Sequence, residues 1–359
     1  MRNGEDCGGT VKEMGFRPRS EAFIRAISVH LPETVVTNLQ LQEENADWDM
    51  AKIEAKVGIK ARHVAPPEVT AGDLAYFAAR SLFESSDVDR NSIDFLLFCT
   101  QSPDYFLPAT ACILQDRLRL GTHCAALDFN QGCSGYVYGL RLAESLVAAG
   151  NAKRVLFLTG ETYSKYIHSR DRSVRVLFGD GATATLIDDT GPGARILAGC
   201  LGSDGSGAEN LIVRSGGMRS RRSSGEVPIE TGQHESVGQL ETLFMDGQEL
   251  FQFTLRRIPP LVEATAKLNN VALEEVDWFV FHQANVFMNE HIRRKLKIPQ
   301  EKAPIVLEDV GNTVSNTIPI AIHRLGDQFR PGQKLMLVGF GVGYSWGACM
   351  LEWQPIHRA

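Results

Sequence analysis

The chain repeats itself, and this repeat constrains its fold more than any other feature of the sequence. The segments IDFLLFCTQSPDYFLPATACILQDRL (93–118) and VDWFVFHQANVFMNEHIRRKL (276–296) share an aspartate, an apolar run, a polar turn and a helical pattern, at an offset of 183 residues between Asp94 and Asp277. Two further pairs follow in the same order: ALDFNQGCSG with VLEDVGNTVSN at an offset of 179, and RVLFLTG with KLMLVGF at 180. Three ordered matches at nearly one offset indicate a duplication.

Each copy alternates short apolar runs with amphipathic helical patterns, which is typical of buried strands covered by crossover helices. We therefore expect two α/β halves packed against each other, residues 21–192 and 193–359, after a flexible leader at residues 1–20. A length of 359 residues suits two such halves, because single cores stop growing at about 250–300 residues. A site between the halves would use matching strand ends.

Composition excludes several classes of protein. A formal net charge of -6 argues against a nucleic-acid binder, which should present a basic face. The one basic cluster, Arg219, Arg221 and Arg222, lies in a Ser/Gly-rich stretch, where a solvated loop is a commoner outcome than a phosphate site. The uncharged run 335–351 contains four glycines and reads as two buried strands joined at a turn, so we expect no membrane span.

The cysteines indicate a reducing compartment. There are seven, an odd number, widely spaced and without a CxxC pair, so neither a disulfide framework nor a zinc site is signalled. The N-terminus lacks the apolar core of a signal peptide. We expect a cytoplasmic protein without a bound metal.

Cys133 stands at a Gly-Cys-Ser-Gly corner between a strand-like run and a helical pattern. A helix N-terminus presents unpaired N–H groups and a positive dipole end, which favour thiolate over thiol and can bind an oxyanion. Gly132 and Gly135 permit the tight turn. The plainer alternative is a buried, inert cysteine. The apolar positions that define one face of the following helix are Val137, Leu140, Ala143 and Val147.

Two polar residues share this strand-end placement. His282 closes the apolar strand DWFVFHQAN, and Asn312 lies in the turn DVGNTVSN that the duplication sets against Cys133. Alone, each has an ordinary structural reading, as a core histidine and a turn asparagine. Their convergence is what a nucleophile with activating partners requires. The order Cys, His, Asn is also that of papain-like proteases, but the duplicated halves argue against that class.

Five motifs occur together: NQGCSGYVYGL, FGDGATATLI, HQAN, GNTVSNTIP and GFGVGYSWG. Their set and order closely resemble β-ketoacyl-ACP synthase III, the initiating condensing enzyme of fatty-acid synthesis, from about residue 22 to residue 354. The resemblance implies a thiolase-like fold, with the two α/β halves stacked as an αβαβα sandwich. It also implies acyl-CoA or acyl-ACP as donor, malonyl-ACP as second substrate, and no cofactor.

The resemblance assigns roles to the corner residues. Cys133 would accept the acyl group, while His282 and Asn312 would bind the malonyl thioester carbonyl and donate hydrogen bonds to the enolate left by loss of CO₂. The N–H groups of Cys133 and Val342 would form the oxyanion hole. Val342 replaces a usual glycine, and a β-branched residue restricts the backbone that presents this N–H.

The carrier-facing residues depart from the family pattern. Lys52 stands where a tryptophan stacks on the adenine of coenzyme A, although Arg172 matches the arginine on its other side. Phe287 replaces a basic residue used to dock the acidic carrier protein, while Arg294 and Lys295 keep positive charge nearby. We expect docking to the acyl carrier protein to be weaker or differently placed.

Four more positions match substrate contacts of the family. Gly247 and Asn285 match residues along the pantetheine arm, and Phe178 matches one that lines its tunnel. Leu107 matches the residue that the partner subunit inserts into the acyl pocket, which implies a homodimer. Because leucine is smaller than the phenylalanine of acetyl-specific members, we expect acyl groups longer than acetyl to fit.

Alternatives remain open. The Cys133-bound acyl group could pass to an oxygen or nitrogen nucleophile of a specialised pathway, or the chain could be a non-catalytic partner in a dimer. Hydroxymethylglutaryl-CoA synthase is disfavoured because Gln101 stands where that family has its catalytic glutamate. A biosynthetic thiolase is disfavoured because GFGVG lacks the second cysteine. Chain length, donor carrier and pathway stay undetermined at this level.

Overall fold

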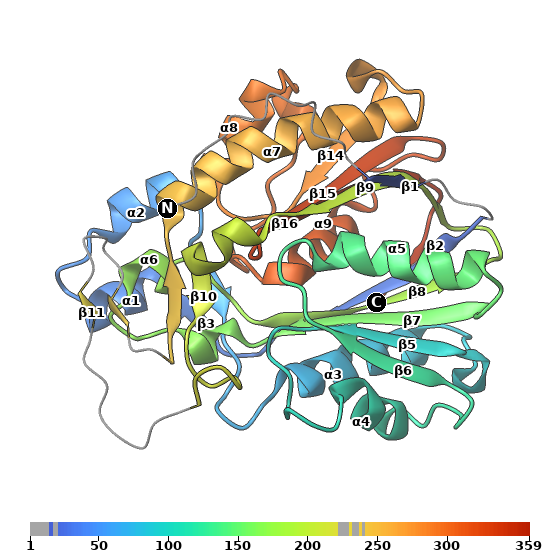
Figure 1. Ribbon diagram of the computed structural model, residues 1–359, viewed down its shortest axis with the longest axis horizontal. Coiled ribbons are helices and arrows are strands. Elements are labelled where there is room, and N and C mark those ends of the chain that lie inside the picture. Colours follow the sequence, from blue (N-terminus) through green and yellow to red (C-terminus); the bar gives the residue numbers. More distant parts are fainter. Residues whose placement is uncertain (1–13, 17–20, 222–229, 232–236, 239–240) are drawn as a thin grey trace.

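A computed structural model describes residues 14–16, 21–221, 230–231, 237–238 and 241–359 (Figure 1). Its main sheet runs in the order β14, β15, β16, β9, β2, β8, β7, β5, β6, with β1 and β17 pairing at its side. Its strands are β1 (Met14–Phe16), β2 (Phe23–His30), β5 (Phe95–Cys99), β6 (Ala125–Phe129), β7 (Arg154–Glu161), β8 (Gly181–Asp188), β9 (Ala194–Ser203), β14 (Trp278–Phe281), β15 (Lys334–Gly341), β16 (Ser345–Glu352) and β17 (His357–Arg358).

The duplication predicted from the sequence is present in the strand order. In the N-terminal half, β5 is parallel to β7, and β8 and β2 then continue antiparallel. In the C-terminal half, β14 is parallel to β15, and β16 and β9 continue antiparallel. The two halves join where β2 and β9 pair over only two residues each. The expected division at residues 192 and 193 falls between β8 and β9.

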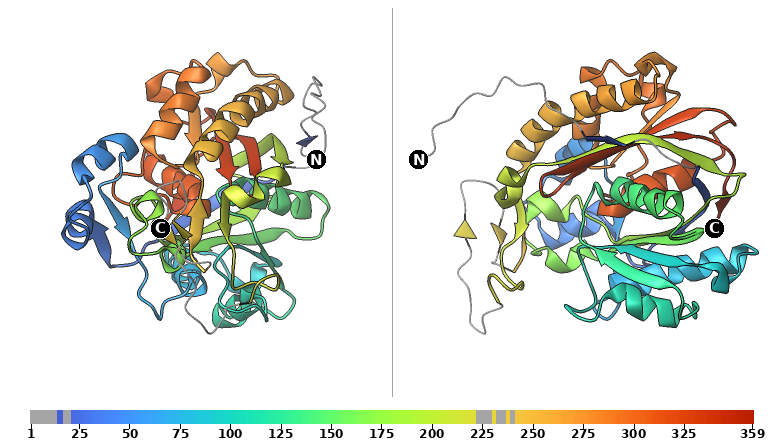
Figure 2. Two further views of the ribbon diagram at one scale, coloured as in Figure 1. Left: turned by 60° about the vertical axis from the view of Figure 1, so that its left-hand side comes forward. Right: turned by 45° about the vertical axis from the view of Figure 1, so that its right-hand side comes forward.

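Helices form three layers around the two halves of the sheet. α3 (Ala71–Ser85) and α4 (Thr110–Arg117) cover one outer face, and α7 (Gly247–Leu268) and α8 (Val286–Lys295) cover the other (Figure 1). α5 (Gly135–Ala148) and α9 (Thr317–Leu325) lie between the sheets, as the right-hand view of Figure 2 shows. This confirms the αβαβα layering.

Shorter elements complete the described fold. They are β3 (Val35–Thr37), α1 (Asn38–Glu44), α2 (Met50–Val57), β4 (Ala61–His63), η1 (Arg90–Ser92), η2 (Tyr163–Tyr166), α6 (Arg172–Arg175), η3 (Gly205–Asn210), β10 (Leu211–Val213), β11 (Glu230–Thr231), β12 (Val237–Gly238), β13 (Leu243–Met245), η4 (Leu273–Glu275), η5 (Gln300–Lys302) and η6 (Val314–Asn316).

The central helix α5 forms where the apolar spacing predicted it. All four residues of its predicted face are buried, because the helix is enclosed between the two sheets. Gly139 is required at its crossing with β7, since a Cβ there would lie 2.0 Å from the ring of Phe157. The tight crossing brings the N-terminus of α5 close to the strand ends.

Two other expectations have clear outcomes. The uncharged run 335–351 is the buried antiparallel pair β15 and β16, and no helix in the described part of the chain is long and apolar enough to span a bilayer. Within the leader expected at residues 1–20, Met14–Phe16 forms a strand that pairs with β9, with Met14 opposite Leu201. Residues 1–13 and 17–20 lie outside the described residues.

Candidate active site

Cys133 lies at the corner between β6 and α5, one residue before the helix N-cap Ser134, with 6% of its surface exposed. The corner packs against β15 of the other half, where two glycines make room for it. A Cβ at Gly341 would sit 3.0 Å from Sγ of Cys133, and one at Gly339 would sit 2.9 Å from its carbonyl oxygen. The duplicated strand therefore places the cysteine against the C-terminal half.

The prediction that Cys133 is ionised as a thiolate is wrong for the resting protein. Burial raises the pKa of the thiol to about 12, and the nearby carboxyl of Glu161 raises it further. The helix N-terminus favours the thiolate by at most about 2 kcal/mol, which is smaller than the cost of charging a fully buried thiol. Cys133 therefore rests as a neutral thiol, and its proton has to be taken up when it attacks.

His282 follows the last residue of β14 and is 2% exposed. Its backbone N–H donates to the carbonyl of Val338 in β15 at 2.7 Å, and its ring meets Phe340 edge-on, with centroids 5.5 Å apart. Nδ1 lies 2.7 Å from Oγ1 of Thr317, so Nε2 is the ring nitrogen left for a substrate. Burial lowers the pKa of His282 to about 3, which keeps the imidazole neutral.

Asn312 comes to the site through backbone bonds to the other half. Its N–H donates to the carbonyl of Leu177 at 2.8 Å, and its carbonyl accepts the N–H of Gly179 at 3.0 Å. These two bonds form a parallel β-bridge between Asn312 and Phe178. Its side-chain Oδ1 accepts the N–H of Val314 at 2.9 Å. Because Oδ1 is engaged, the amide presents Nδ2 as a donor, and this nitrogen has no partner within the described residues.

The predicted oxyanion donors are available. Within the described part of the chain the N–H of Val342 makes no hydrogen bond, and that of Cys133 contacts only its own thiol. Val342 follows the end of β15, and its side chain closes on the corner: a Cβ at Gly132 would meet its Cγ1 at 2.5 Å. Valine in place of glycine thus adds bulk beside the nucleophile.

Sequence reasoning missed Glu161, at the end of β7, which has no exposed surface. Its carboxyl accepts the N–H of Gln101 at 3.1 Å and the hydroxyl of Ser102 at 3.0 Å, and Ser315 approaches it at 3.4 Å. Burial raises the pKa of Glu161 to about 8. The strand-end position after the apolar run RVLFLTG was the available signal. This carboxyl ties the loop after β5 to the turn that carries Asn312.

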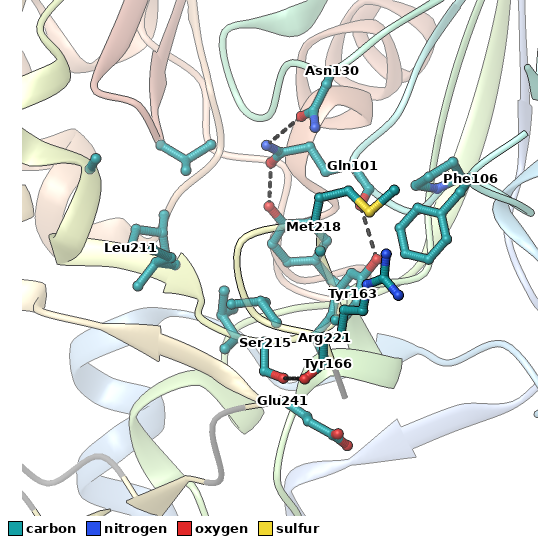
Figure 3. A pocket seen from close by; sticks show the side chains of 18 of the residues that line it. Gln101, Phe106, Asn130, Tyr163, Tyr166, Leu211, Ser215, Met218, Arg221 and Glu241 are labelled. Carbon is teal, nitrogen blue, oxygen red and sulfur yellow. Dashed lines mark hydrogen bonds between the residues drawn. The ribbon is translucent and has the colours of Figure 1, made fainter. Parts of the chain in front are cut away.

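A pocket of about 1120 Å³ opens beside Val342 and Gly343. Figure 3 shows Gln101 and Asn130 in the upper part of the view and Ser215 and Glu241 in the lower part, all of them lining this pocket. Apolar side chains supply most of the remaining lining: Pro103, Tyr105, Phe106, Leu211, Ile212, Val213, Met218 and Leu243.

The remaining predicted residues lie around this centre. Phe178 is buried, with its ring 5.2 Å from that of Tyr163. Asn285 caps α8 by accepting the N–H of Met288 at 2.8 Å, and Gly247 begins α7 with open space at its α-carbon. Arg172 begins the short helix α6.

Three expectations concern surface and metal chemistry. Arg219 and Arg221 are exposed, in keeping with a solvated loop, while Arg222 lies outside the described residues. Phe287 is 38% exposed, and Leu107 is 82% exposed in a loop beside the pocket. Among the residues that the structure describes, no three His, Cys, Asp or Glu side chains gather as a metal site.

Comparison with known proteins identifies the family. Residues 127–205 match "3-Oxoacyl-[acyl-carrier-protein (ACP)] synthase III", and residues 266–353 match its C-terminal part. The β-ketoacyl-ACP synthases III of Caldanaerobacter subterraneus subsp. tengcongensis and Methylococcus capsulatus are each 34% identical, over 92% and 90% of this chain and 98% and 96% of theirs. The chain belongs to the β-ketoacyl-ACP synthase III family.

Solved structures of the family agree. A 3-oxoacyl-ACP synthase III is 47% identical with a TM-score of 0.89, over 93% of this chain and 100% of that one. The enzyme of Burkholderia xenovorans is 35% identical with a TM-score of 0.86, over 97% and 99%. The thiolase-like fold inferred from five motifs is confirmed, as is the assignment to the condensing acyltransferases. The protease alternative has no support in these matches.

Proposed function

We propose that the chain loads an acyl group on Cys133 and condenses it with malonyl-ACP. The single observation that carries this proposal is the arrangement around Asn312 and His282. Oδ1 of Asn312 is engaged by Val314, which leaves Nδ2 as a donor for a thioester oxygen, and Nδ1 of His282 is engaged by Thr317, which leaves Nε2 as the ring nitrogen that can exchange a proton. A fixed amide donor at a buried site suits the stabilisation of an enolate.

In the first half-reaction, the sulfur of Cys133 attacks the donor thioester, and the bond between acyl carbon and carrier sulfur breaks. The thiol proton ends on the departing carrier thiolate, and Nε2 of His282 is the ring nitrogen available to relay it. The N–H groups of Cys133 and Val342 hold the oxyanion. Two such donors are typical of acyl transfer.

In the second half-reaction, the malonyl carboxylate leaves as CO₂, and its bonding electrons form the enolate. The enolate carbon attacks the acyl-cysteine, which releases the sulfur of Cys133 as a thiolate. That thiolate takes a proton from solvent, as its raised pKa favours. The product is a β-ketoacyl thioester on the carrier.

Docking of the carrier protein rests on a rearranged basic surface. Nζ of Lys56 in α2 lies 5.5 Å above the ring of Phe287, so a positive charge remains beside the position that lost one. Arg294 and Lys295 extend this charge along α8. We expect Lys56→Glu to slow reaction with malonyl-ACP but not with a small malonyl thioester. Lys153→Glu, at an exposed turn before β7, is the matched control.

A homodimer is part of the proposal. β6 ends the described sheet as an edge strand, with Leu127 46% exposed, and the adjoining loop exposes Tyr105, Phe106 and Leu107 by 62%, 83% and 82%. An unpaired edge beside an apolar loop suits a second copy of the chain. Analytical ultracentrifugation should give a mass of two chains. The Leu127→Glu substitution should shift this mass toward that of one chain. The free cysteines of the described chain accord with a cytoplasmic setting.

The test is a panel of acyl thioesters, of CoA and of ACP, followed by intact mass. We expect one acyl adduct on Cys133, absent in Cys133→Ala, and CO₂ release when malonyl-ACP is added. Acylation without CO₂ release from any malonyl donor would favour transfer to an oxygen or nitrogen nucleophile instead. No adduct across the panel would favour a non-catalytic dimer partner.

A further inference from the structure

Gln101 borders the nucleophile, although condensation as derived above gives it no role. A Cβ at Gly132, the residue before Cys133, would lie 2.5 Å from Oε1 of Gln101. The same missing Cβ faces Val342 on its other side. The carboxamide of Gln101 and the side chain of Val342 therefore line the pocket on either side of the residue before Cys133.

Hydrogen bonds fix which end of this carboxamide accepts and which donates. The hydroxyl of Tyr163, itself 4% exposed, donates to Oε1 of Gln101, and Nε2 donates to Oδ1 of Asn130 at 3.0 Å (Figure 3). The carbonyl oxygens of both amides are thus engaged. The second N–H of Gln101 and the amide nitrogen of Asn130 have no partner within the described residues. The two side chains therefore offer unpaired hydrogen-bond donors and no unpaired carbonyl oxygen.

The backbone around Gln101 is equally well held. Its N–H donates to Glu161 at 3.1 Å, and its carbonyl accepts the hydroxyl of Tyr166 at 3.0 Å. A residue anchored at both backbone groups and at Oε1 presents its remaining N–H in one direction. Such preorganisation is what a selective binding group needs.

A plain alkyl chain is a poor complement to this carboxamide. It would remove water from the unpartnered N–H of Gln101 without replacing the lost hydrogen bond, which costs binding free energy, whereas Asn130 is exposed and keeps its water. An oxygen acceptor beside Gln101 would satisfy this N–H. Sites that bind a substrate oxygen in this way reject analogues without it.

We propose that the acyl group loaded on Cys133 carries a hydroxyl or keto oxygen within a few carbons of its thioester, and that Gln101 recognises this oxygen. Gln101 is then a specificity-determining residue. The inference rests on the proposed function, because it requires acylation of Cys133. It adds the chemical class of the donor to that reaction.

The experiment is a competition between matched acyl groups. The protein receives equal amounts of butyryl and 3-hydroxybutyryl N-acetylcysteamine thioesters, and in a second arm butyryl and 3-oxobutyryl thioesters. Intact mass gives the ratio of the two adducts on Cys133. We expect one oxygenated acyl group to exceed butyryl by about tenfold in the wild type, the effect of roughly one net hydrogen bond.

Gln101→Leu should bring that ratio close to one, because it removes the donor and keeps the size of the side chain. Gln42→Leu, the same change at an exposed position of α1, should keep the wild-type ratio. A ratio of adducts is insensitive to a loss of total activity, so partial misfolding does not mimic the effect. The wild-type ratio also serves as a test that needs no variant.

Equal or greater loading of butyryl in the wild type overturns the inference while the proposed function stands. An unchanged ratio in Gln101→Leu removes Gln101 from the recognition. Absence of every adduct, including those from the broad thioester panel, contradicts the proposed function and takes the inference with it.

Discussion

The backbone N–H of Val314 donates to Oδ1 of Asn312 at 2.9 Å. The carbonyl of Val314 accepts the hydroxyl of Thr317 at 3.1 Å, and that hydroxyl contacts Nδ1 of His282 at 2.7 Å. Val314 thus holds both polar groups of the site. Its φ of +57° is rare for a β-branched residue and costs about 1–3 kcal/mol, so the turn that holds both groups is strained.

Asn312→Ala should lower CO₂ release from malonyl-ACP by about a hundredfold or more, since one lost donor to a developing oxyanion costs about 2.7–4 kcal/mol. The acyl-enzyme should still form, because the oxyanion donors of Cys133 and Val342 are untouched. The paired measurements are burst acylation by mass and CO₂ release. Wild-type CO₂ release in the variant would remove Asn312 from the condensation step.

Thr317→Val should slow turnover about tenfold or more, which is the effect of losing about one buried hydrogen bond. The substitution removes the only side chain in the described chain that is hydrogen-bonded to the imidazole of His282. Thr317→Ser, which keeps the hydroxyl, should restore most of the rate. The readout is the kcat for condensation beside the KM for malonyl-ACP. Equal rates in the Val and Ser variants would show that the hydroxyl does not position His282.

Alkylation of Cys133 by iodoacetamide should accelerate about tenfold per pH unit from pH 7 to 9, because only the thiolate reacts and its pKa is raised to about 12. Peptide mass spectrometry separates Cys133 from the exposed Cys112. A rate that is already level above pH 7 would mean that the helix N-terminus does hold a thiolate.

Glu161→Gln should change how stability depends on pH. The pKa of Glu161 is raised from 4.5 to about 8 in the folded protein, so between these values unfolding releases its proton and stability falls as pH rises. Over that window the wild type should lose about 1.4 kcal/mol of unfolding free energy per pH unit relative to Glu161→Gln. Denaturant unfolding at pH 5, 6 and 7 measures it. Glu43→Gln, at an exposed position, is the control, and parallel curves for wild type and Glu161→Gln would refute the raised pKa.

Leu107→Phe should shift acyl preference toward short chains, and the effect should appear in the neighbouring subunit. Leu107 is 82% exposed in its own chain, so it does not fill its own pocket. A mixed dimer of a wild-type subunit and a subunit with the double substitution Cys133→Ala, Leu107→Phe tests this effect across the dimer. Only the wild-type subunit of that dimer can be acylated, and the substituted Leu107 position belongs to its neighbour. An unchanged chain-length profile in that dimer would place Leu107 outside the acyl pocket.

Local sequence pattern was enough to locate the deeply buried helices and strands. The helix α5 lies where its apolar spacing predicted it, and the strands β5, β15 and β16 lie where continuous apolar runs predicted strands buried on both faces. β1 escaped notice, since three residues carry no measurable period and pairing with β9 decides their structure. Cys133, His282 and Asn312 could be singled out because each follows a strand end in a repeated plan.

The sequence by itself determined the duplicated α/β architecture, the family and the identity of the three polar residues at the strand ends. Only the tertiary structure decided their ionisation and surroundings. The helix N-terminus predicted a thiolate, yet burial between two sheets keeps Cys133 a thiol and His282 a neutral imidazole. Desolvation depends on every chain segment packed around a group, and those segments come from both halves. The same holds for Gln101, Tyr163 and Asn130, which lie far apart in sequence and meet only where β5, β6 and β7 end side by side.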